Sequence, residues 1–314
     1  MTWRLVAVGI LGSLATLAEP RSMEVPPLVG GTGPASPQDA AVIADTLVVA
    51  GLEGEVVKID LQSGERTTLP LPEPVASVTH AGEGKILAVS KSGASVTVLD
   101  SQGKVAAAHR LVVRIRSACT LGGELVAAQM LAKKAGQPLL WRGILPELRR
   151  WSLPAPAVPV EGVAADLAWT TALACDDTTA AVVWWFFHSE VVLLNADGRT
   201  RVVPLPAFGA AGASQSHLGE DWTQWPKAYF DVAVGGGRVW CLTFNEGPWH
   251  GDPQQRRRGR HLVEVAMDGS VVATHSLPAD MFQVAYDGPR HRLLLLDRQG
   301  AVWVARKTTS PGVP

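Results

Sequence analysis

Side chains able to bind a ligand or to move a proton gather in two stretches of the chain, residues 208–227 and 246–260. Both stretches combine tryptophan with histidine, carboxylates or arginine. The indole ring offers a flat apolar surface for a sugar ring or a partner protein, whereas His and Asp can hold a cation or share a proton. The residues that we expect to bind a ligand or partner are His217, Asp221, Trp222, Trp225, Trp249, His250, Asp252 and Arg257.

These residues also have structural interpretations. Long loops need small cores of their own, and the three tryptophans would supply them. The arginine run at 256–258 could clamp a carboxylate or phosphate, or could be a solvated loop. The pairs His217/Asp221 and His250/Asp252 could form a metal site, but no His-Glu-x-x-His or His-x-His pattern supports one. We therefore predict no metal, no cofactor and, in the absence of a Gly-x-Ser-x-Gly motif, no catalytic residue.

The rest of the chain repeats a pattern of β-rich runs and turns with a period of about 40 to 50 residues. One element has two β-rich runs around an Asp or Asn turn with glycine, and it often ends in Leu-Pro. It begins at Val56, Val96, Val191 and Leu262, with a degraded copy at Leu139. The turn residues tolerate a positive φ, which a tight hairpin requires.

A second hairpin precedes each copy, so each unit holds four short strands. These hairpins begin at Ala41, Ser77, Ser117, Ala172, Asp231 and Gln283. The last unit lacks a fourth strand, which residues 23–29 can supply. Four-stranded units closed in this way are typical of a β-propeller. The chain resembles the six-bladed propeller superfamily that includes TolB-like and NHL-like proteins.

We therefore predict an all-β fold in which residues 19–314 form one six-bladed β-propeller with four-stranded antiparallel blades. The predicted blades are 40–72, 75–111, 113–154, 163–206, 229–278 and 281–307 plus 23–29. Glu124–Met130 is expected to be a strand despite its helix-forming residues, because it occupies a second-strand position. Trp184–Phe187 is expected to lie in a middle strand, with alternate side chains on opposite faces.

The geometry of a propeller sorts the connections onto two faces. Connections between strands one and two, and between three and four, share one face, whereas those between strands two and three, and between blades, share the other. We name the second the insertion face, because all four predicted insertions fall there: Gly30–Gln38, Lys133–Pro138, Phe208–Lys227 and Glu246–Arg260. Ligand sites of repeat folds usually occupy the face that carries the insertions.

Three further polar residues are weaker candidates. His188 ends a predicted strand on the insertion face. Asp231 and His80 occupy first-strand positions, whose side chains can point into the central channel. Each of the three also has a structural interpretation as a packed core or rim residue.

Residues 1–18 have the features of a secretory signal: Arg4, an apolar stretch over Leu5–Leu17 and small residues at Ala15 and Ala18. A membrane anchor or a buried first strand is the alternative. No other stretch is long and apolar enough to span a bilayer. We therefore expect an exported protein, periplasmic or extracellular.

Composition narrows the class of protein further. A hydrophobic share of 47% excludes a disordered chain, and a net charge of −1 argues against nucleic acid as a partner. Cys119, Cys175 and Cys241 are odd in number and lie in apolar strand contexts. We expect each to be a buried small hydrophobe rather than part of a disulfide framework.

These observations predict an exported propeller, a monomer, that binds a small-molecule ligand or a protein partner on the insertion face without catalysis. The alternative is a hydrolase or lyase with its site at the mouth of the central channel.

Overall fold

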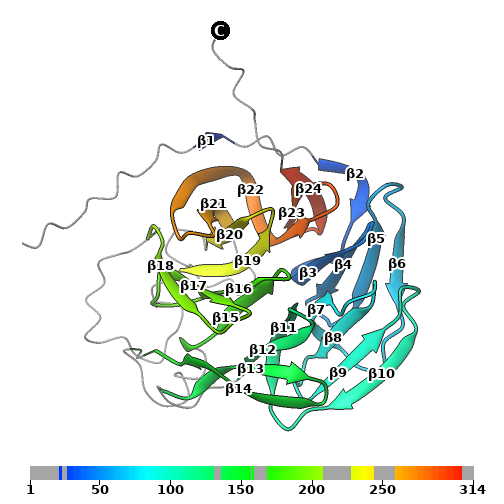
Figure 1. The fold of residues 1–314 in the computed structure, drawn as a ribbon. Coiled ribbons are helices and arrows are strands. Elements are labelled where there is room, and N and C mark those ends of the chain that lie inside the picture. The colour runs from blue at the N-terminus through cyan, green and yellow to red at the C-terminus, as the bar shows by residue number, and fades with distance from the viewer. Residues whose placement is uncertain are drawn as a thin grey trace, which may run out of the picture.

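The computed structural model describes residues 21–22, 27–130, 136–156, 158, 168–207, 228–243 and 259–305. Every element in this part of the chain is a β-strand. The strands form sheets that surround a central channel, with the first strand of each predicted unit innermost, which is the architecture of a β-propeller (Figure 1). Within these residues no helix is long and apolar enough to cross a membrane.

Four of the sheets have four antiparallel strands each and correspond to the first four predicted blades. The first contains β3 (Pro37–Ile43), β4 (Thr46–Gly51), β5 (Val56–Asp60) and β6 (Arg66–Leu69). The second contains β7 (Val75–His80), β8 (Ile86–Ser90), β9 (Ser95–Leu99) and β10 (Val105–Arg110). The third contains β11 (Ile115–Leu121), β12 (Glu124–Gln129), β13 (Pro138–Ile144) and β14 (Glu147–Pro154). The fourth contains β15 (Thr171–Cys175), β16 (Thr179–Trp184), β17 (Glu190–Asn195) and β18 (Thr200–Pro204).

The remaining strands form a single eight-stranded sheet. Its members are β19 (Tyr229–Gly235), β20 (Arg238–Thr243), β21 (Gly259–Ala266), β22 (Val271–Asp287), β23 (Arg292–Asp297), β24 (Ala301–Ala305), β2 (Pro27–Thr32) and β1 (Arg21–Ser22). Six separate blades are therefore not seen, because the described residues form five sheets. The reason is that β22 is continuous: its first part pairs with β21 and its last part pairs with β23.

The predicted closure by an N-terminal strand is confirmed, at a shifted position. β2 pairs antiparallel with β24 and begins at Pro27 rather than residue 23. The same strand takes up part of the predicted insertion Gly30–Gln38, and only residues 33–36 separate β2 from β3. β1 adds a parallel pairing on the other side of β22.

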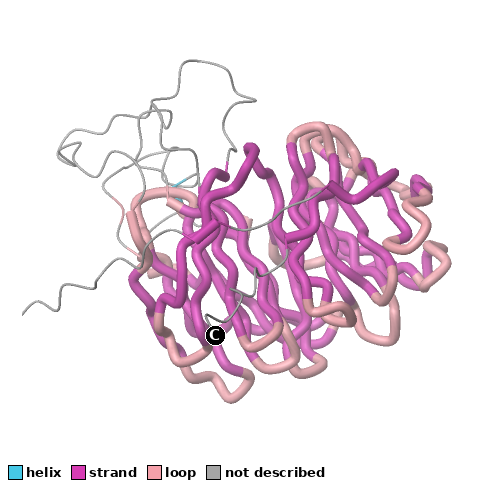
Figure 2. The backbone as a smooth tube through the Cα atoms, turned by 90° about the horizontal axis from the view of Figure 1, so that it is seen from above, coloured by secondary structure: helices cyan, strands magenta, loops and turns pink. Residues whose placement is uncertain are grey.

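Aspartate side chains hold the short turns. The Asp60 carboxylate accepts hydrogen bonds from the Gln62 and Ser63 amides, at 2.9 and 2.6 Å. Asp100 and Asp268 accept bonds from amides two residues further on in the same way. A glycine with positive φ completes each of these turns, which confirms the predicted turn chemistry. We name the side of the molecule that carries them the turn face; its short turns line one edge of Figure 2.

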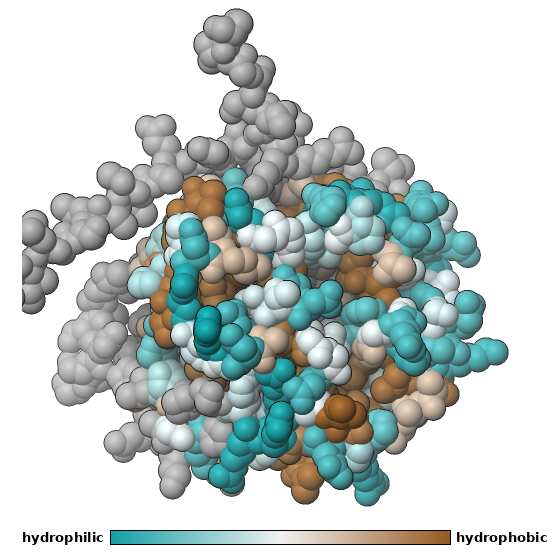
Figure 3. All heavy atoms as spheres, in the orientation of Figure 1, coloured by the Kyte–Doolittle hydropathy of each residue, from teal (hydrophilic) through white to brown (hydrophobic). Residues whose placement is uncertain are grey.

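The apolar core lies between neighbouring sheets. Val48 and Val56 of the first sheet pack with Ile86 of the second. On the other side of the first sheet, Leu47 packs with Leu294 of the eight-stranded sheet, so the ring of packed sheets is continuous. Strands buried on both faces explain a chain with only 18% charged residues. On the surface seen in Figure 3, hydrophobic side chains are scattered among hydrophilic ones.

Two local predictions have opposite outcomes. The strand predicted at Glu124–Met130 is confirmed as β12, which ends at Gln129. The middle strand predicted over Trp184–Phe187 is wrong, because β16 ends at Trp184. Residues 185–189 form the connection to β17 instead, and Phe187 has a φ of 65°.

Candidate functional site

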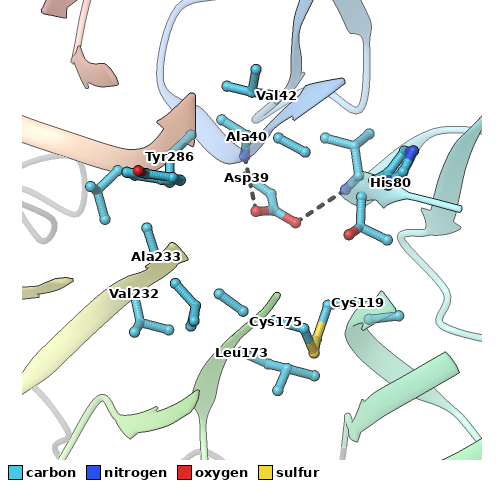
Figure 4. A pocket seen from close by; sticks show the side chains of 18 residues that line it. Asp39, Ala40, Val42, His80, Cys119, Leu173, Cys175, Val232, Ala233 and Tyr286 are labelled. Atoms are coloured by element: carbon cyan, nitrogen blue, oxygen red, sulfur yellow. Dashed lines mark hydrogen bonds between the residues drawn. A yellow bond between two sulfur atoms is a disulfide. The ribbon is translucent and has the colours of Figure 1, made fainter. Parts of the chain in front are cut away.

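Inner strands from all the predicted units line the central channel. β3, β7, β11, β15, β19 and the last part of β22 surround a cavity of about 120 Å³ (Figure 4). Most of its walls are alanine, valine and leucine. Pockets for drug-sized ligands are larger, roughly 300–1,000 Å³. The channel interior is therefore too small for a drug-sized ligand, and a site for one must lie at one of its ends.

Polar residues mark the channel end at the insertion face. In five of the six inner segments a β-bulge interrupts the pairing with the next strand just after the segment begins. A bulge changes the direction in which the following side chain points. The residue after the bulge is polar in every case: Asp39, Ser77, Ser117, Asp231 and Gln283. These polar residues thus lie at the insertion-face end of the channel, beyond its apolar wall.

Asp39 joins two neighbouring inner strands. Its carboxylate accepts hydrogen bonds from the amides of Ala40, at 2.9 Å, and of Val78 in β7, at 3.1 Å; both are drawn in Figure 4. Burial raises the pKa of Asp39 to about 6, although these amides and the Arg116 guanidinium act in the opposite direction. Asp39 therefore gains and loses its proton close to neutral pH, a property common in functional sites.

Arg116 in β11 stands beside this carboxyl group. Its guanidinium lies 4.3 Å from the centre of the Trp185 ring, a cation–π contact. Among the described residues it makes no hydrogen bond or ion pair, so its N–H donors are available to a ligand. Burial lowers the pKa of Arg116 to about 10, which leaves it charged at neutral pH. A stacked guanidinium with unused donors is suited to a carboxylate.

The backbone holds Trp185 in place under Arg116. The Trp185 amide donates to the Thr170 carbonyl at 3.0 Å, and the Ala228 amide donates to the Trp185 carbonyl at 2.9 Å. The left-handed conformation of Phe187, two residues later, is strained for a non-glycine residue, and such strain gathers at functional sites. His188 lies in the same connection, and its ring is 5.7 Å from that of Trp184.

Two of the weaker candidates from the sequence, His80 and Asp231, lie on inner strands. His80 lines the cavity, together with Tyr286 from β22. Asp231 is buried, and its carboxylate accepts a hydrogen bond from the Val284 amide at 2.7 Å. This bond links β19 to β22 as Asp39 links β3 to β7. Asp231 also lies close to Cys241, and burial together with this carboxylate raises the pKa of the thiol.

The prediction for two of the three cysteines is wrong. Cys119 in β11 and Cys175 in β15 form a disulfide on the channel wall, with Cα atoms 5.6 Å apart. Their separation of 56 residues is close to one repeat, which places them on neighbouring inner strands. That spacing was the signal available in the sequence. Cys241 is free and buried, as predicted.

All the ligand-binding residues predicted from the sequence lie outside the described residues. They are His217, Asp221, Trp222, Trp225, Trp249, His250, Asp252 and Arg257. The described strands nevertheless fix where their two segments join the fold. One segment leaves after β18 and enters β19, and the other leaves β20 and enters β21. Antiparallel pairing puts these strand ends on the insertion face.

The first of these segments joins the fold beside Arg116. It ends at Ala228, the residue whose amide donates to Trp185. Sequence reasoning missed Arg116 and Asp39, because neither belongs to a motif. Both lie at the start of an inner strand, next to a bulge. They can be recognised as site residues only when the pairing register of these strands is known. Within the described residues, no group of three or more His, Cys, Asp or Glu side chains could hold a metal ion.

Comparisons with known proteins agree on the fold. No protein-family model matches the chain, and no curated protein is similar to it in sequence. Among solved structures, a calcium-binding regucalcin from Agrobacterium tumefaciens has a TM-score of 0.60 and 15% identity, covering 92% of this chain and 95% of its own. A gluconolactonase from Xanthomonas campestris has a TM-score of 0.59 and 14% identity, covering 90% and 89%. A Bacteroides vulgatus protein of the DUF4221 family has a TM-score of 0.62 and 9% identity, covering 91% and 97%. At these identities the likeness shows that the chain has a β-propeller fold.

Proposed function

We propose that this protein is a binding protein for a small carboxylate ligand, which it holds at the insertion-face mouth of its channel without chemical turnover. The observation that carries the proposal is Arg116, a stacked guanidinium whose donors no described residue uses. The ligand's carboxylate would accept hydrogen bonds from this guanidinium, and Asp39 would bind a hydroxyl of the ligand. The ligand-binding residues predicted in 208–227 and 246–260 would also contact the ligand.

Titration of a panel of small carboxylates, from acetate to gluconate, by calorimetry tests this proposal. Arg116→Gln should weaken binding of the best carboxylate at least about tenfold, because the charge-assisted pair is lost. Arg114→Gln is the matched control, because Arg114 lies two residues earlier and is exposed. Equal losses in both variants, or no saturable binding in the unaltered protein, would contradict the proposal.

A lactone hydrolase is the second candidate function. Asp39, with a pKa of about 6 beside a guanidinium, has the properties of a general acid or base. One of the similar solved structures is a gluconolactonase. Release of acid from glucono-lactone by the purified protein, reduced about a hundredfold in Asp39→Asn, would favour this function over the first. Hydrolysis at the uncatalysed rate would eliminate it.

We propose that the protein is exported. A disulfide is typical of oxidising compartments and supports export, together with the predicted signal at residues 1–18. Expression of the full chain followed by N-terminal sequencing of the exported product should give a new N-terminus near residue 19. A product that stays inside the cell with Met1 intact would contradict this expectation.

We propose that the eight-stranded sheet acts as two blades, so that the propeller is six-bladed in its packing. The support is that β22 changes partner along its length, from β21 to β23. Two glycines inserted after Pro278, where the partner changes, should leave unfolding cooperative. A broad or two-step unfolding transition would show that β22 must be continuous.

A further inference from the structure

A second pocket lies on the turn face, between the units that begin with β19 and with the last part of β22. Its volume is about 240 Å³, larger than that of the channel cavity. Two short turns form its rim, at residues 236–237 and 288–291. The residues that line it are Gly235, Gly236, Arg238, Trp240, Tyr286, His291, Arg292, Leu293 and Ala305.

Buried carboxylates orient the two arginines of this pocket. The Arg238 Nε donates to Glu264 at 3.0 Å, and the Arg292 Nε donates to Asp287 at 2.7 Å. Glu264 and Asp287 are 2% and 0% exposed, so both ion pairs are protected from solvent. A guanidinium held by its Nε edge keeps its outer N–H groups for another acceptor.

Part of this donor capacity is unused. The Arg238 Nη1 donates to the Gly237 carbonyl at 2.9 Å. The Arg292 Nη2 is buried and has no hydrogen-bond partner in the described part of the chain. A buried donor without an acceptor is costly, so a small shift of the partly exposed Arg292 guanidinium toward an incoming carboxylate oxygen would be favourable.

The other walls suit a ligand with an apolar body. Trp240, Leu293 and Ala305 form an apolar floor. The Tyr286 ring lies against Gly235 and Gly236, where a Cβ on either glycine would collide with it. The Tyr286 hydroxyl and the His291 Nδ1 are 3.2 Å apart at the rim.

Charge alone would not draw an anion into this pocket. Arg290, like Arg292, contacts Asp287, and it also reaches Asp45 at 2.5 Å. His275 contacts Glu264 at 3.3 Å from the far side. Arginines and carboxylates are therefore equal in number around the pocket. Binding would rest on the spare N–H donors and on burial of apolar surface.

We propose that this turn-face pocket binds a small carboxylate with an apolar body, such as an aromatic acid. The carboxylate would accept hydrogen bonds from Arg292 and Arg238, and the body would lie on Trp240 and Leu293. This site is separate from the mouth of the channel and does not depend on the function proposed above.

Calorimetric titration with benzoate tests the proposal. The protein used carries Arg116→Gln, so that the channel mouth makes no contribution. We expect one benzoate per chain and binding at least about tenfold weaker for acetate, which lacks the apolar body. Equal affinity for the two acids, or no saturation by benzoate, would overturn the proposal.

Two variants locate the site. Ala305→Leu adds bulk to the floor without touching a charge and should reduce benzoate affinity at least about tenfold. Arg292→Lys keeps the charge beside Asp287 but removes Nη2 and should have a similar effect. Arg199→Lys is the control, since Arg199 forms an exposed ion pair with Asp197 elsewhere on the turn face. Benzoate binding that survives Ala305→Leu in a protein with an unchanged unfolding midpoint would place the ligand elsewhere and overturn the proposal.

Discussion

The two ends of the central channel use similar residues in different ways. At the turn face, Arg238 and Arg292 are fixed by buried carboxylates, and a disulfide joins two inner strands nearby. At the insertion face, Arg116 stacks on the Trp185 ring beside Asp39 and forms no ion pair among the described residues, and Asp39 has a raised pKa. Buried carboxylates thus orient the arginines of one end, whereas the arginine of the other end has no ion-pair partner among the described residues. Such a division is expected where loops carry function on a rigid scaffold.

Removing the disulfide should cause the largest loss of unfolding free energy among these tests. Replacing both Cys119 and Cys175 with alanine releases a loop of 56 residues, and the loop-closure estimate for that length is about 4 kcal/mol. Urea unfolding of the double variant should show a loss of this order. Reduction of the unaltered protein should give a similar loss. A change below about 1 kcal/mol in both experiments would mean that packing alone holds β11 against β15.

Arg292→Ala should cause the next largest loss of unfolding free energy. Arg292→Ala leaves Asp287 buried beside Arg290 alone, and removing one partner of a buried ion pair costs about 3 kcal/mol. The exposed pair of Arg199 with Asp197 provides the control, for which Arg199→Ala should cost less than about 1 kcal/mol. Equal losses of unfolding free energy in the two variants would show that the turn-face arginines are not structural.

The carboxyl groups at the two ends should respond to pH with opposite sign. Burial raises the pKa of Asp39 from 3.8 to about 6, so the folded state holds the proton more tightly than the unfolded state. This contribution to stability is present below pH 4 and is lost as the pH rises to about 6. Hydrogen bonds in the turns lower the pKa of Asp60 and Asp268. The ionised carboxylates therefore stabilise the fold above pH 4, and this stabilisation is lost as the pH falls and they become protonated.

Unfolding free energies measured from pH 2 to pH 7 separate these contributions. Asp39→Asn replaces the titrating carboxyl group with a neutral amide, whose oxygen can still accept the hydrogen bond from the Val78 amide. The variant should therefore gain stability relative to the unaltered protein as the pH rises through 6. Asp60→Asn should instead lose stability relative to the unaltered protein as the pH rises toward 4, and the difference should stay constant above that pH. A parallel pH profile for Asp39→Asn and the unaltered protein would show that Asp39 is ionised throughout.

The sequence allowed the repeating parts of this fold to be predicted, because each turn carries its own chemistry. The Asp and Gly of residues 60–64 specify a turn locally, without help from the rest of the protein. β22 is one continuous strand, although Leu277-Pro278 in the sequence resembles the end of a strand. Proline is tolerated there because the strand changes partner between Ser276 and Met281, where a ladder bond is not required of its nitrogen.

The candidate site could be predicted less well, because it depends on contacts between repeats. Arg114 and Arg116 are two residues apart in one run, yet one is exposed and the other stacks on Trp185 from the next sheet. Only the register of β11, with its bulge before Ser117, distinguishes them. The pairing of Cys119 with Cys175 depends in the same way on which inner strands are neighbours.

The smallest expected effect on stability is the one that most sharply tests the division between the two ends. Arg116→Gln removes a charge that has no ion-pair partner among the described residues. Asp39 lies beside it, and loss of the guanidinium raises the pKa of this carboxyl further, so the group is neutralised by a proton rather than left charged. The lost cation–π contact is worth about 0.5–1 kcal/mol, and relief of the desolvated charge offsets part of it. Urea unfolding should therefore place this variant within about 1 kcal/mol of the unaltered protein, while the carboxylate binding assigned to the channel mouth is lost. A loss of stability as large as that of Arg292→Ala would make Arg116 a structural residue and would remove the main support for a ligand site at the channel mouth.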